Sequence, residues 1–272
     1  MKLRDSVVEM KIAAKVFVLF LVMAGICRAG CCRKSLSGEK AKADSVEEIL
    51  TQLSESTGEL RSYEGRVEYL FSQPLFESQT LRKGMLYYQR CEKTSKLRIN
   101  FETRKQDDEK ERKHIEELIF DGQWLTVIDY QMKEVKKHQL AEANEPVDAF
   151  ELARENFPII GFGKREDLKK DFEIELVDEQ EEGRDDFIGL HLKVKPDSVY
   201  KDDYTSIDFW IDKGLFLPGK IVALSTEEDI YQIELLDAKV NEKIDEKVFE
   251  FEVPEGFGEP EIIPLKKKAG QK

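Results

Sequence analysis

Apolar and polar residues alternate with a period of two from Tyr63 onward, over most of the chain. Because successive side chains of a strand point to opposite faces of a sheet, this period predicts half-buried β-strands. Short turns separate the segments, and strands do not alternate regularly with long helices. We therefore expect a mainly β fold with a few helices, built as an antiparallel meander of about 10 to 11 strands. The predicted strands lie at 63–71, 84–88, 97–102, 115–120, 124–130 with its continuation at 135–140, 172–176, 188–195, 206–212, 220–224, 230–240 and 248–253.

Apolar residues recur at the spacing of a helix only in short segments. One apolar stripe between Val46 and Leu53 predicts a helix of about four turns, capped by Asp44 or Ser45 and ending near Gly58. Two further short helices are expected, at 147–156 and 164–171.

The connecting segments carry signals of their own. Asp121-Gly122 stands between two apolar runs and predicts a tight turn. Residues 104–113 are nearly all charged and predict a solvated hairpin loop. Residues 33–44 are polar and aperiodic, which is typical of a flexible tether.

Several strands are apolar on both faces, among them 85–88 and 124–128. A sheet that curves around an apolar cavity, with helices over one side, needs such strands. Two sheets packed as a sandwich need them too. Periodicity alone leaves both architectures open.

The net charge of the chain limits the classes of partner that it can bind. The formal net charge is -13 at pH 7. An acidic body repels nucleic acid and anionic lipid headgroups, so we exclude nucleic-acid binding.

The beginning of the chain has the pattern of an export signal. Lys11 and Lys15 precede eleven uninterrupted apolar residues, 16–26, and small residues follow up to Gly30. This pattern predicts a signal peptide over residues 1–29, because a membrane span needs about 20 apolar residues. An uncleaved anchor and a start at Met10 are the alternatives.

Two cleavage sites compete. Ala29 suits ordinary signal peptidase, which would release a soluble protein. Arg28-Ala29-Gly30-Cys31 resembles a bacterial lipobox, in which Cys31 would be acylated, although Arg28 stands where an aliphatic residue is usual. We expect a periplasmic protein that is either soluble or lipid-anchored through Cys31.

The sequence lacks the motifs of catalysis and metal binding. His114, His138 and His191 each lie more than four residues from any other His or Cys. The sequence contains no Gly-x-Ser-x-Gly, no phosphate-binding loop and no Gly-x-Gly-x-x-Gly. We therefore expect a protein that is not an enzyme and that holds no metal or cofactor.

Five stretches, taken in chain order, resemble segments of one protein family. Residues 84–90 match a Gly-x-Leu-aromatic strand that ends in arginine, and residues 120–125 match an Asp-Gly turn before an aromatic strand. Residues 150–156 match a lid helix, and residues 210–218 match a strand followed by an Asp turn and Leu-Pro. Residues 248–256 match a closing Phe-x-Phe-x-x-Pro-x-Gly. The family is that of the outer-membrane lipoprotein carriers LolA and LolB, with their wider superfamily.

The resemblance implies a curved, incompletely closed antiparallel β-barrel with an apolar cavity, covered by the N-terminal helix and a short lid helix. Residues 45–257 would form this lipid-binding domain, with a tether at 30–44 and a basic tail at 258–272. In the carriers, the arginine after the early strand bonds the lid and gates the cavity. Its match is Arg90, which Cys91 follows where the family has proline.

Aromatic and aliphatic residues of the strands and the lid are expected to line the cavity and bind lipid. Periodicity does not say which face of each strand points inward. The predicted residues are Tyr69, Phe71, Leu86, Tyr88, Leu97, Ile99, Phe101, Leu118, Phe120, Trp124, Phe150, Leu152, Phe209 and Ile211.

The predicted function is that of a monomeric periplasmic carrier, which shelters the acyl chains of lipoproteins or lipids on the way to the outer membrane. The resemblance implies an inner-membrane ABC exporter and an outer-membrane receptor as its partners. Two alternatives stay open. One is an envelope-stress sensor or scaffold on the same fold, and the other is an unrelated secreted β-rich enzyme or sugar-binding module.

Overall fold

The computed structural model describes residues 45–92, 94–142, 147–148, 165–177 and 186–265. Within this part, twelve strands form one sheet in the order β12-β6-β5-β4-β3-β2-β1-β11-β10-β9-β8-β7. The strands are β1 Ser62–Gln73, β2 Ser78–Arg90, β3 Ser95–Gln106, β4 Arg112–Phe120, β5 Trp124–Asp129, β6 Glu134–Gln139, β7 Phe172–Val177, β8 Phe187–Val194, β9 Tyr204–Asp212, β10 Pro218–Ser225, β11 Ile230–Val240 and β12 Glu261–Ile263.

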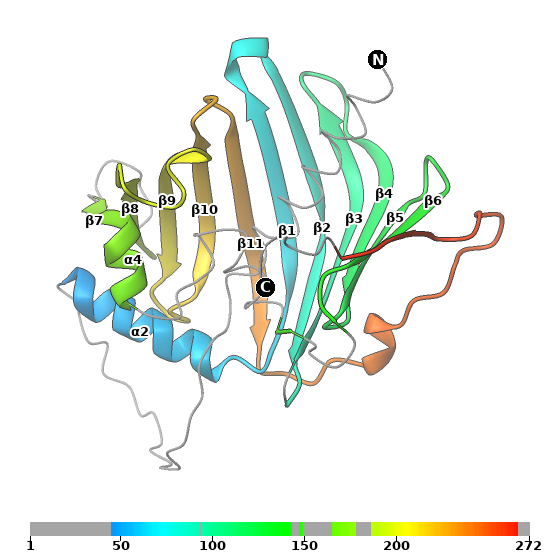
Figure 1. Cartoon of the computed structure of the whole chain (residues 1–272), viewed down its shortest axis with the longest axis horizontal. Helices are drawn as coiled ribbons and strands as arrows, with labels where there is room; N and C mark the ends of the chain where they lie inside the picture. The colour runs from blue at the N-terminus through cyan, green and yellow to red at the C-terminus, as the bar shows by residue number, and fades with distance from the viewer. Residues whose placement is uncertain (1–44, 93, 143–146, 149–164, 178–185, 266–272) are drawn as a thin grey trace, which may run out of the picture.

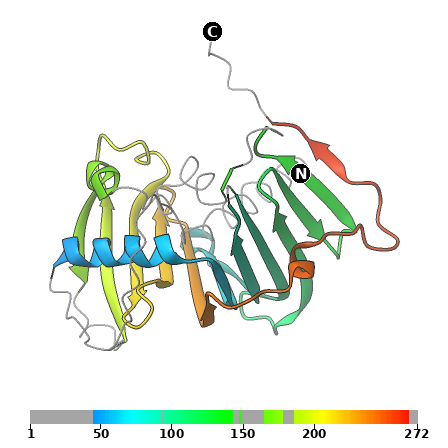
Figure 2. The same cartoon turned by 90° about the horizontal axis from the view of Figure 1, so that it is seen from below.

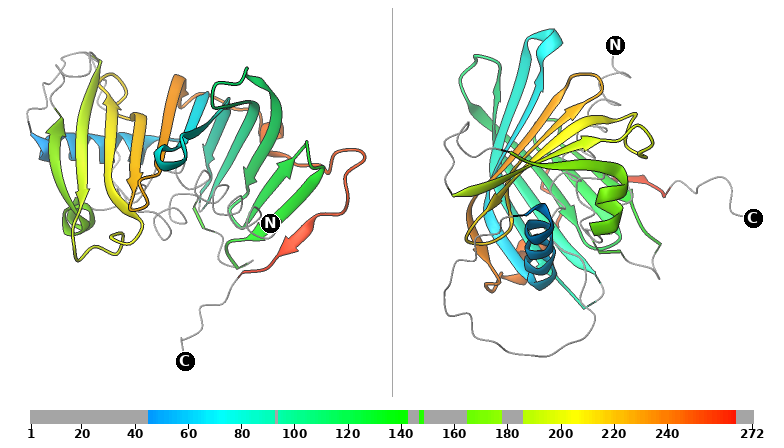
Figure 3. Two further views of the ribbon diagram at one scale, coloured as in Figure 1. Left: turned by 90° about the horizontal axis from the view of Figure 1, so that it is seen from above. Right: turned by 90° about the vertical axis from the view of Figure 1, so that its left-hand side faces the viewer.

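The sheet has two arms that meet at its centre (Figure 1). β1 to β6 run outward as an antiparallel meander, which we call the first arm. β7 to β11 form the second arm, and β11 returns to pair with the free side of β1, where Tyr69 lies opposite Ile233. The sheet is strongly curved and its outermost strands do not pair with each other (Figure 3). This open, mainly β architecture confirms the predicted fold class.

The predicted N-terminal helix is present as α2, Val46–Glu59. The Ser45 side chain caps it by accepting a hydrogen bond from the Glu48 backbone N–H at 3.3 Å. The apolar stripe is buried in the core through Ile49, Leu50 and Leu53. Seen from below, α2 crosses the second arm (Figure 2). Among the described residues, no helix is long and apolar enough to span a membrane.

The predicted helix at 164–171 is present as α4, Arg165–Asp171, and its Leu168 belongs to the same core. The predicted signal peptide and tether lie outside the described residues, as does most of the helix expected at 147–156.

The Asp121-Gly122 turn is confirmed. Gly122 has a φ of +100°, a conformation that favours glycine. The Asp121 carboxylate accepts the backbone N–H groups of Gln123 and Trp124 at 2.9 and 2.7 Å. The turn therefore sets the start of β5.

The charged segment 104–113 is less of a loop than we predicted. β3 continues to Gln106 and β4 begins at Arg112, so that Arg104 pairs with Arg112 across the ladder. The long β1–β2 hairpin offers β3 a partner here, because Thr80 lies opposite Gln106. Backbone pairing thus continues through residues whose charge suggested a loop.

The predicted strand at 248–253 is wrong. A short 3-10 helix, η3 Glu246–Phe249, is followed by a segment without ladder pairing. The Arg98 guanidinium donates to the backbone carbonyls of Val248 and Glu250 at 2.7 and 3.1 Å. A side chain therefore satisfies carbonyls that a strand would pair with a neighbour.

The sheet also extends past the predicted boundary at residue 257. β12 pairs in parallel with β6, and Ile262 lies opposite Lys137. In Figure 1 this segment runs beside β6 in red. Residues 261–263, which we assigned to a basic tail, are therefore part of the sheet.

Candidate functional site

The first arm carries a continuous apolar surface on the same side of the sheet as α2, which we call the inner face. Leu86 of β2 lies opposite Ile99 of β3, and Ile99 lies opposite Leu118 of β4. Two residues further along these strands, Tyr88 lies opposite Leu97 and Leu97 lies opposite Phe120. Eight predicted cavity residues lie here with at most 3% of their surface exposed: Tyr69, Leu86, Tyr88, Leu97, Ile99, Phe101, Leu118 and Phe120.

The second arm continues this surface. Phe209 of β9 lies between Leu190 of β8 and Ile221 of β10, and Ile211 lies opposite Ile188. These residues belong to the same buried cluster as those of the first arm. Phe71 is partly buried at the junction, where its ring stacks on that of Tyr231 with centroids 5.0 Å apart. The predicted strand residues of both arms thus meet on one face, with one exception.

The exception is Trp124. Because Leu125 pairs with Phe120, Leu125 faces inward and Trp124 faces the opposite side, which we call the outer face. There the Lys137 ammonium lies 5.5 Å from the Trp124 ring centroid. Trp124 is therefore not part of the inner face. Three other predicted residues lie outside the described part of the chain: Cys31, Phe150 and Leu152.

The inner face is filled in this structure. Ile99, Phe101, Leu118 and Phe120 have no exposed surface, so no water-sized space adjoins them. Two hollows that described residues line, of about 230 and 820 Å³, contain none of the predicted cavity residues. An open apolar cavity stays a prediction, and lipid entry would require a second conformation.

Arg90 holds the C-terminal end of α2. Its Nη1 donates to the Gly58 carbonyl at 2.6 Å and its Nη2 to the Thr57 carbonyl at 3.1 Å. A cation is favoured at this end of a helix, and the last turn of α2 contains no basic residue. We expected Arg90 to bond the lid near Phe150. Among described residues it bonds α2 and, at 3.4 Å, the Tyr88 hydroxyl.

One end of the inner face is polar, which the sequence analysis missed. Tyr69, Arg82 and Arg104 lie side by side on β1, β2 and β3. The Arg82 Nη1 lies 2.9 Å from the Glu116 carboxylate of β4, and their side chains are only 12% and 10% exposed. A signal was present, since Arg82 and Glu116 occupy the alternating positions that Leu86 and Leu118 occupy further along β2 and β4.

Burial shifts the ionisation of this polar end. Burial raises the pKa of the Tyr69 hydroxyl, and Arg82 opposes that rise. Burial, followed by the charges of Arg82 and Arg104, lowers the pKa of His114 below 6.5. At neutral pH the polar end therefore holds neutral tyrosine and histidine beside charged arginines. In the described part of the chain, no three His, Cys, Asp or Glu side chains gather as metal ligands.

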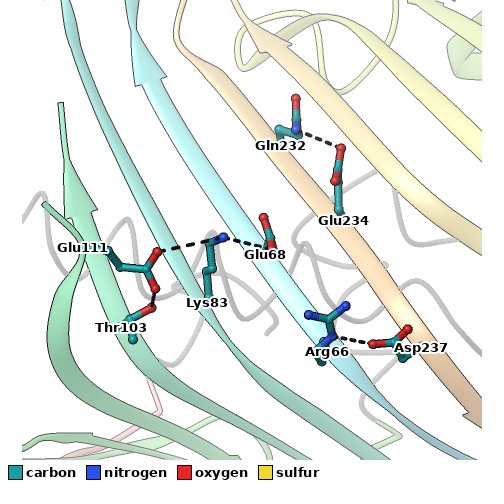
Figure 4. Close-up of polar contacts among 8 residues, drawn as sticks. All are labelled: Arg66, Glu68, Lys83, Thr103, Glu111, Gln232, Glu234 and Asp237. Atoms are coloured by element: carbon teal, nitrogen blue, oxygen red, sulfur yellow. Dashed lines mark hydrogen bonds and ion pairs between the residues drawn. The ribbon is translucent and has the colours of Figure 1, made fainter. Parts of the chain in front are cut away.

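The outer face of the same strands carries solvated ion pairs (Figure 4). The Lys83 ammonium lies 3.2 Å from Glu68 and 4.0 Å from Glu111. Arg66 and Asp237 are 2.5 Å apart, with side chains 58% and 67% exposed. Exposed pairs of this kind are typical of a solvated surface.

No protein-family model and no curated protein sequence matches the chain. Its structure is similar to several solved structures at low sequence identity. An uncharacterized conserved protein from Thermus thermophilus is 9% identical with a TM-score of 0.44, over 80% of this chain and 98% of that one. A LolA superfamily protein from Nitrosomonas europaea is 14% identical with a TM-score of 0.31, over 77% and 99%.

MucB, whose complex with MucA is known from Pseudomonas aeruginosa, is also similar. It is 13% identical with a TM-score of 0.46, over 76% of this chain and 62% of MucB, so the chain spans about three fifths of MucB. The described part of the chain forms an open, curved antiparallel sheet with the N-terminal helix on its inner face.

Proposed function

We propose that the chain is a non-enzymatic carrier that shelters the acyl chains of lipoproteins or lipids on the inner face of its sheet. The observation that carries this proposal is the extent of that face. Apolar residues of both arms form one buried cluster across the sheet. From α2, three fully buried apolar residues join this cluster: Ile49, Leu50 and Leu53.

The free energy that an acyl chain gains on binding is large enough to offset the displacement of α2. Burial of three aliphatic side chains stabilises α2 by about 1.5–3 kcal/mol each, and the bonds from Arg90 add about 1.5–3 kcal/mol. An acyl chain of about sixteen carbons gains about 12 kcal/mol at about 0.8 kcal/mol per methylene. The two sums are of the same order, so an entering acyl chain offsets the displacement of the helix.

In this proposal, the carrier works in the periplasm between an inner-membrane exporter and an outer-membrane receptor. Release of an acyl chain into water is strongly unfavourable, so the chain must pass directly to another apolar site. The five sequence stretches that resemble segments of the outer-membrane lipoprotein carriers support this role. A sensor that binds a protein is the second candidate, because MucB, which has a similar fold, forms a complex with MucA.

The test is to purify the full chain from its native envelope and to identify co-purified lipids and proteins by mass spectrometry. We expect bound lipid or lipoprotein. A fluorescent fatty acid then measures uptake by the wild type, by Arg90→Met and by the matched outer-face control Arg66→Met. We expect faster uptake by Arg90→Met alone, because that variant loses the bonds that hold α2.

Two results would reject the carrier. A preparation that contains no lipid, and no uptake by any of the three proteins, would remove it altogether. Recovery of a membrane signalling protein with an empty inner face would favour the sensor.

A further inference from the structure

The polar end of the inner face is built from residues of four neighbouring strands. Tyr69 lies opposite Arg82, Arg82 lies opposite Arg104, and Glu116 of β4 closes the group through its 2.9 Å ion pair with Arg82. The Arg82 guanidinium also lies 5.9 Å from the ring centroid of Phe101, the neighbouring apolar residue of the inner face. The polar and apolar parts of this face are therefore in direct contact.

Two donors of this polar end have no hydrogen-bond partner among the described residues. They are the Tyr69 hydroxyl and the Arg82 Nε–H group, and both atoms are buried. Tyr69 is only 1% exposed. A buried donor without an acceptor is unfavourable, and native structures seldom leave one without a reason. Both groups donate, so the missing partner is an acceptor.

Two guanidinium groups lie at this end although the whole chain is acidic. Arg82 and Arg104 bring them, the Glu116 carboxylate pairs with Arg82, and the Asp229 carboxylate also acts on the Tyr69 hydroxyl. His114 adds no charge at neutral pH, because its pKa lies below 6.5. Stability does not explain this group, since apolar residues of similar volume often stabilise a core as well as a buried ion pair does.

We infer that this polar end binds the anionic headgroup, a carboxylate or a phosphate, of an amphiphile whose acyl chain lies along the inner face. The inference rests on the proposed carrier function and names a class of cargo for it. Arg82 and Tyr69 donate to the headgroup, and the acyl chain runs along β2 toward Tyr88. From Arg82 to Tyr88 the strand spans about 20 Å. An acyl chain spans about half of a 30 Å hydrocarbon core, or about 15 Å, and fits this length.

The test compares three amphiphiles with the same sixteen-carbon chain: hexadecanoate, hexadecyl phosphate and uncharged hexadecanol. Binding to the full-length protein is measured below micellar concentrations, by displacement of the neutral fluorophore N-phenyl-1-naphthylamine. The wild type should bind the two anions at least about tenfold more tightly than the alcohol, as expected for hydrogen bonds to a charged group. The tighter of the two anions tells whether a fatty-acid carboxylate or a phospholipid phosphate is the cargo.

Tyr69→Phe is the sharpest variant because it removes only the unpaired hydroxyl. It should lower the preference for anions about tenfold and leave hexadecanol binding unchanged. Tyr63→Phe is the matched control, since the Tyr63 hydroxyl is also buried without a described partner but belongs to another part of β1. A second variant, Arg82→Met with Glu116→Gln, removes both charges together and should abolish the preference.

The outcomes separate the two proposals. Equal binding of anions and alcohol by the wild type, or an unchanged preference in Tyr69→Phe and in the double variant, overturns the headgroup site and leaves the carrier intact. Failure of the wild type to bind any of the three amphiphiles overturns both proposals.

Discussion

Two neighbouring residues of β2, Arg82 and Lys83, carry the same charge on opposite faces of one sheet. Arg82 pairs with Glu116 on the inner face at 2.9 Å, and Lys83 pairs with Glu68 on the outer face at 3.2 Å. The two ion pairs have similar distances but differ in exposure. The side chains of the inner pair are 12% and 10% exposed, and those of the outer pair are 38% and 27% exposed. Removing charges from water is costly, whereas exposed pairs contribute little. The inner pair therefore needs a function to explain it, and the outer pair does not.

The largest difference is expected when each pair loses its acid. Glu116→Leu leaves Arg82 charged and almost buried, which should lower the free energy of unfolding by about 3–5 kcal/mol. Glu68→Leu leaves Lys83 in contact with water and should cost less than about 1 kcal/mol. Urea denaturation measures both. Equal losses would show that burial does not separate the two pairs.

A smaller effect is expected where the outer face itself is covered. Arg98 pairs with Glu117 at 2.6 Å and bonds the carbonyls of Val248 and Glu250, so it holds this part of the segment 246–263 against the sheet. Arg98→Met should cost about 2–3 kcal/mol. Hydrogen exchange followed by mass spectrometry should show faster exchange in 246–263 than elsewhere. A uniform increase over the whole sheet would contradict this local role.

The histidines should add a still smaller dependence on pH. Burial lowers the pKa of both His114 and His138 below 6.5 in the folded chain. As the pH falls through 6.5 the unfolded chain takes up these protons first, so stability decreases until the folded pKa is reached. Chemical denaturation between pH 7.5 and pH 5 measures the slope. Replacing both histidines with asparagine should flatten it, and an unchanged slope would assign it to other groups.

The smallest effect is expected for the most exposed pair. Arg66→Met removes the partner of Asp237, and both side chains are largely in water. The free energy of unfolding should change by no more than about 0.5 kcal/mol. Thermal melts at low and high salt provide the measurement. A loss comparable to that of Glu116→Leu would mean that the outer network is structural.

The inner face could be predicted in part because alternation is local. Leu97, Ile99 and Phe101 stand two residues apart, so they must share one face of β3 whatever the rest of the chain does. The run from Trp124 to Ile128 is apolar on both faces, and its period does not choose between them. Only the pairing of Leu125 with Phe120 turns Trp124 outward.

The polar end was missed for a related reason. Charged residues such as Arg82 and Glu116 were expected on solvated positions, although their spacing from Leu86 and Leu118 places them on the inner face. The partner of Arg90 was equally beyond prediction, because the end of α2 that it holds lies some 30 residues away in the sequence.

The sequence by itself determined most of the strands, the position of α2 and the sharing of faces within each strand, because these follow from backbone geometry over a few residues. Only the tertiary structure decided which face is buried, where Arg90 and Arg98 bond, and that the inner face ends in buried charge. Those outcomes depend on segments that are distant in sequence and meet only when the sheet curves and its two arms pair.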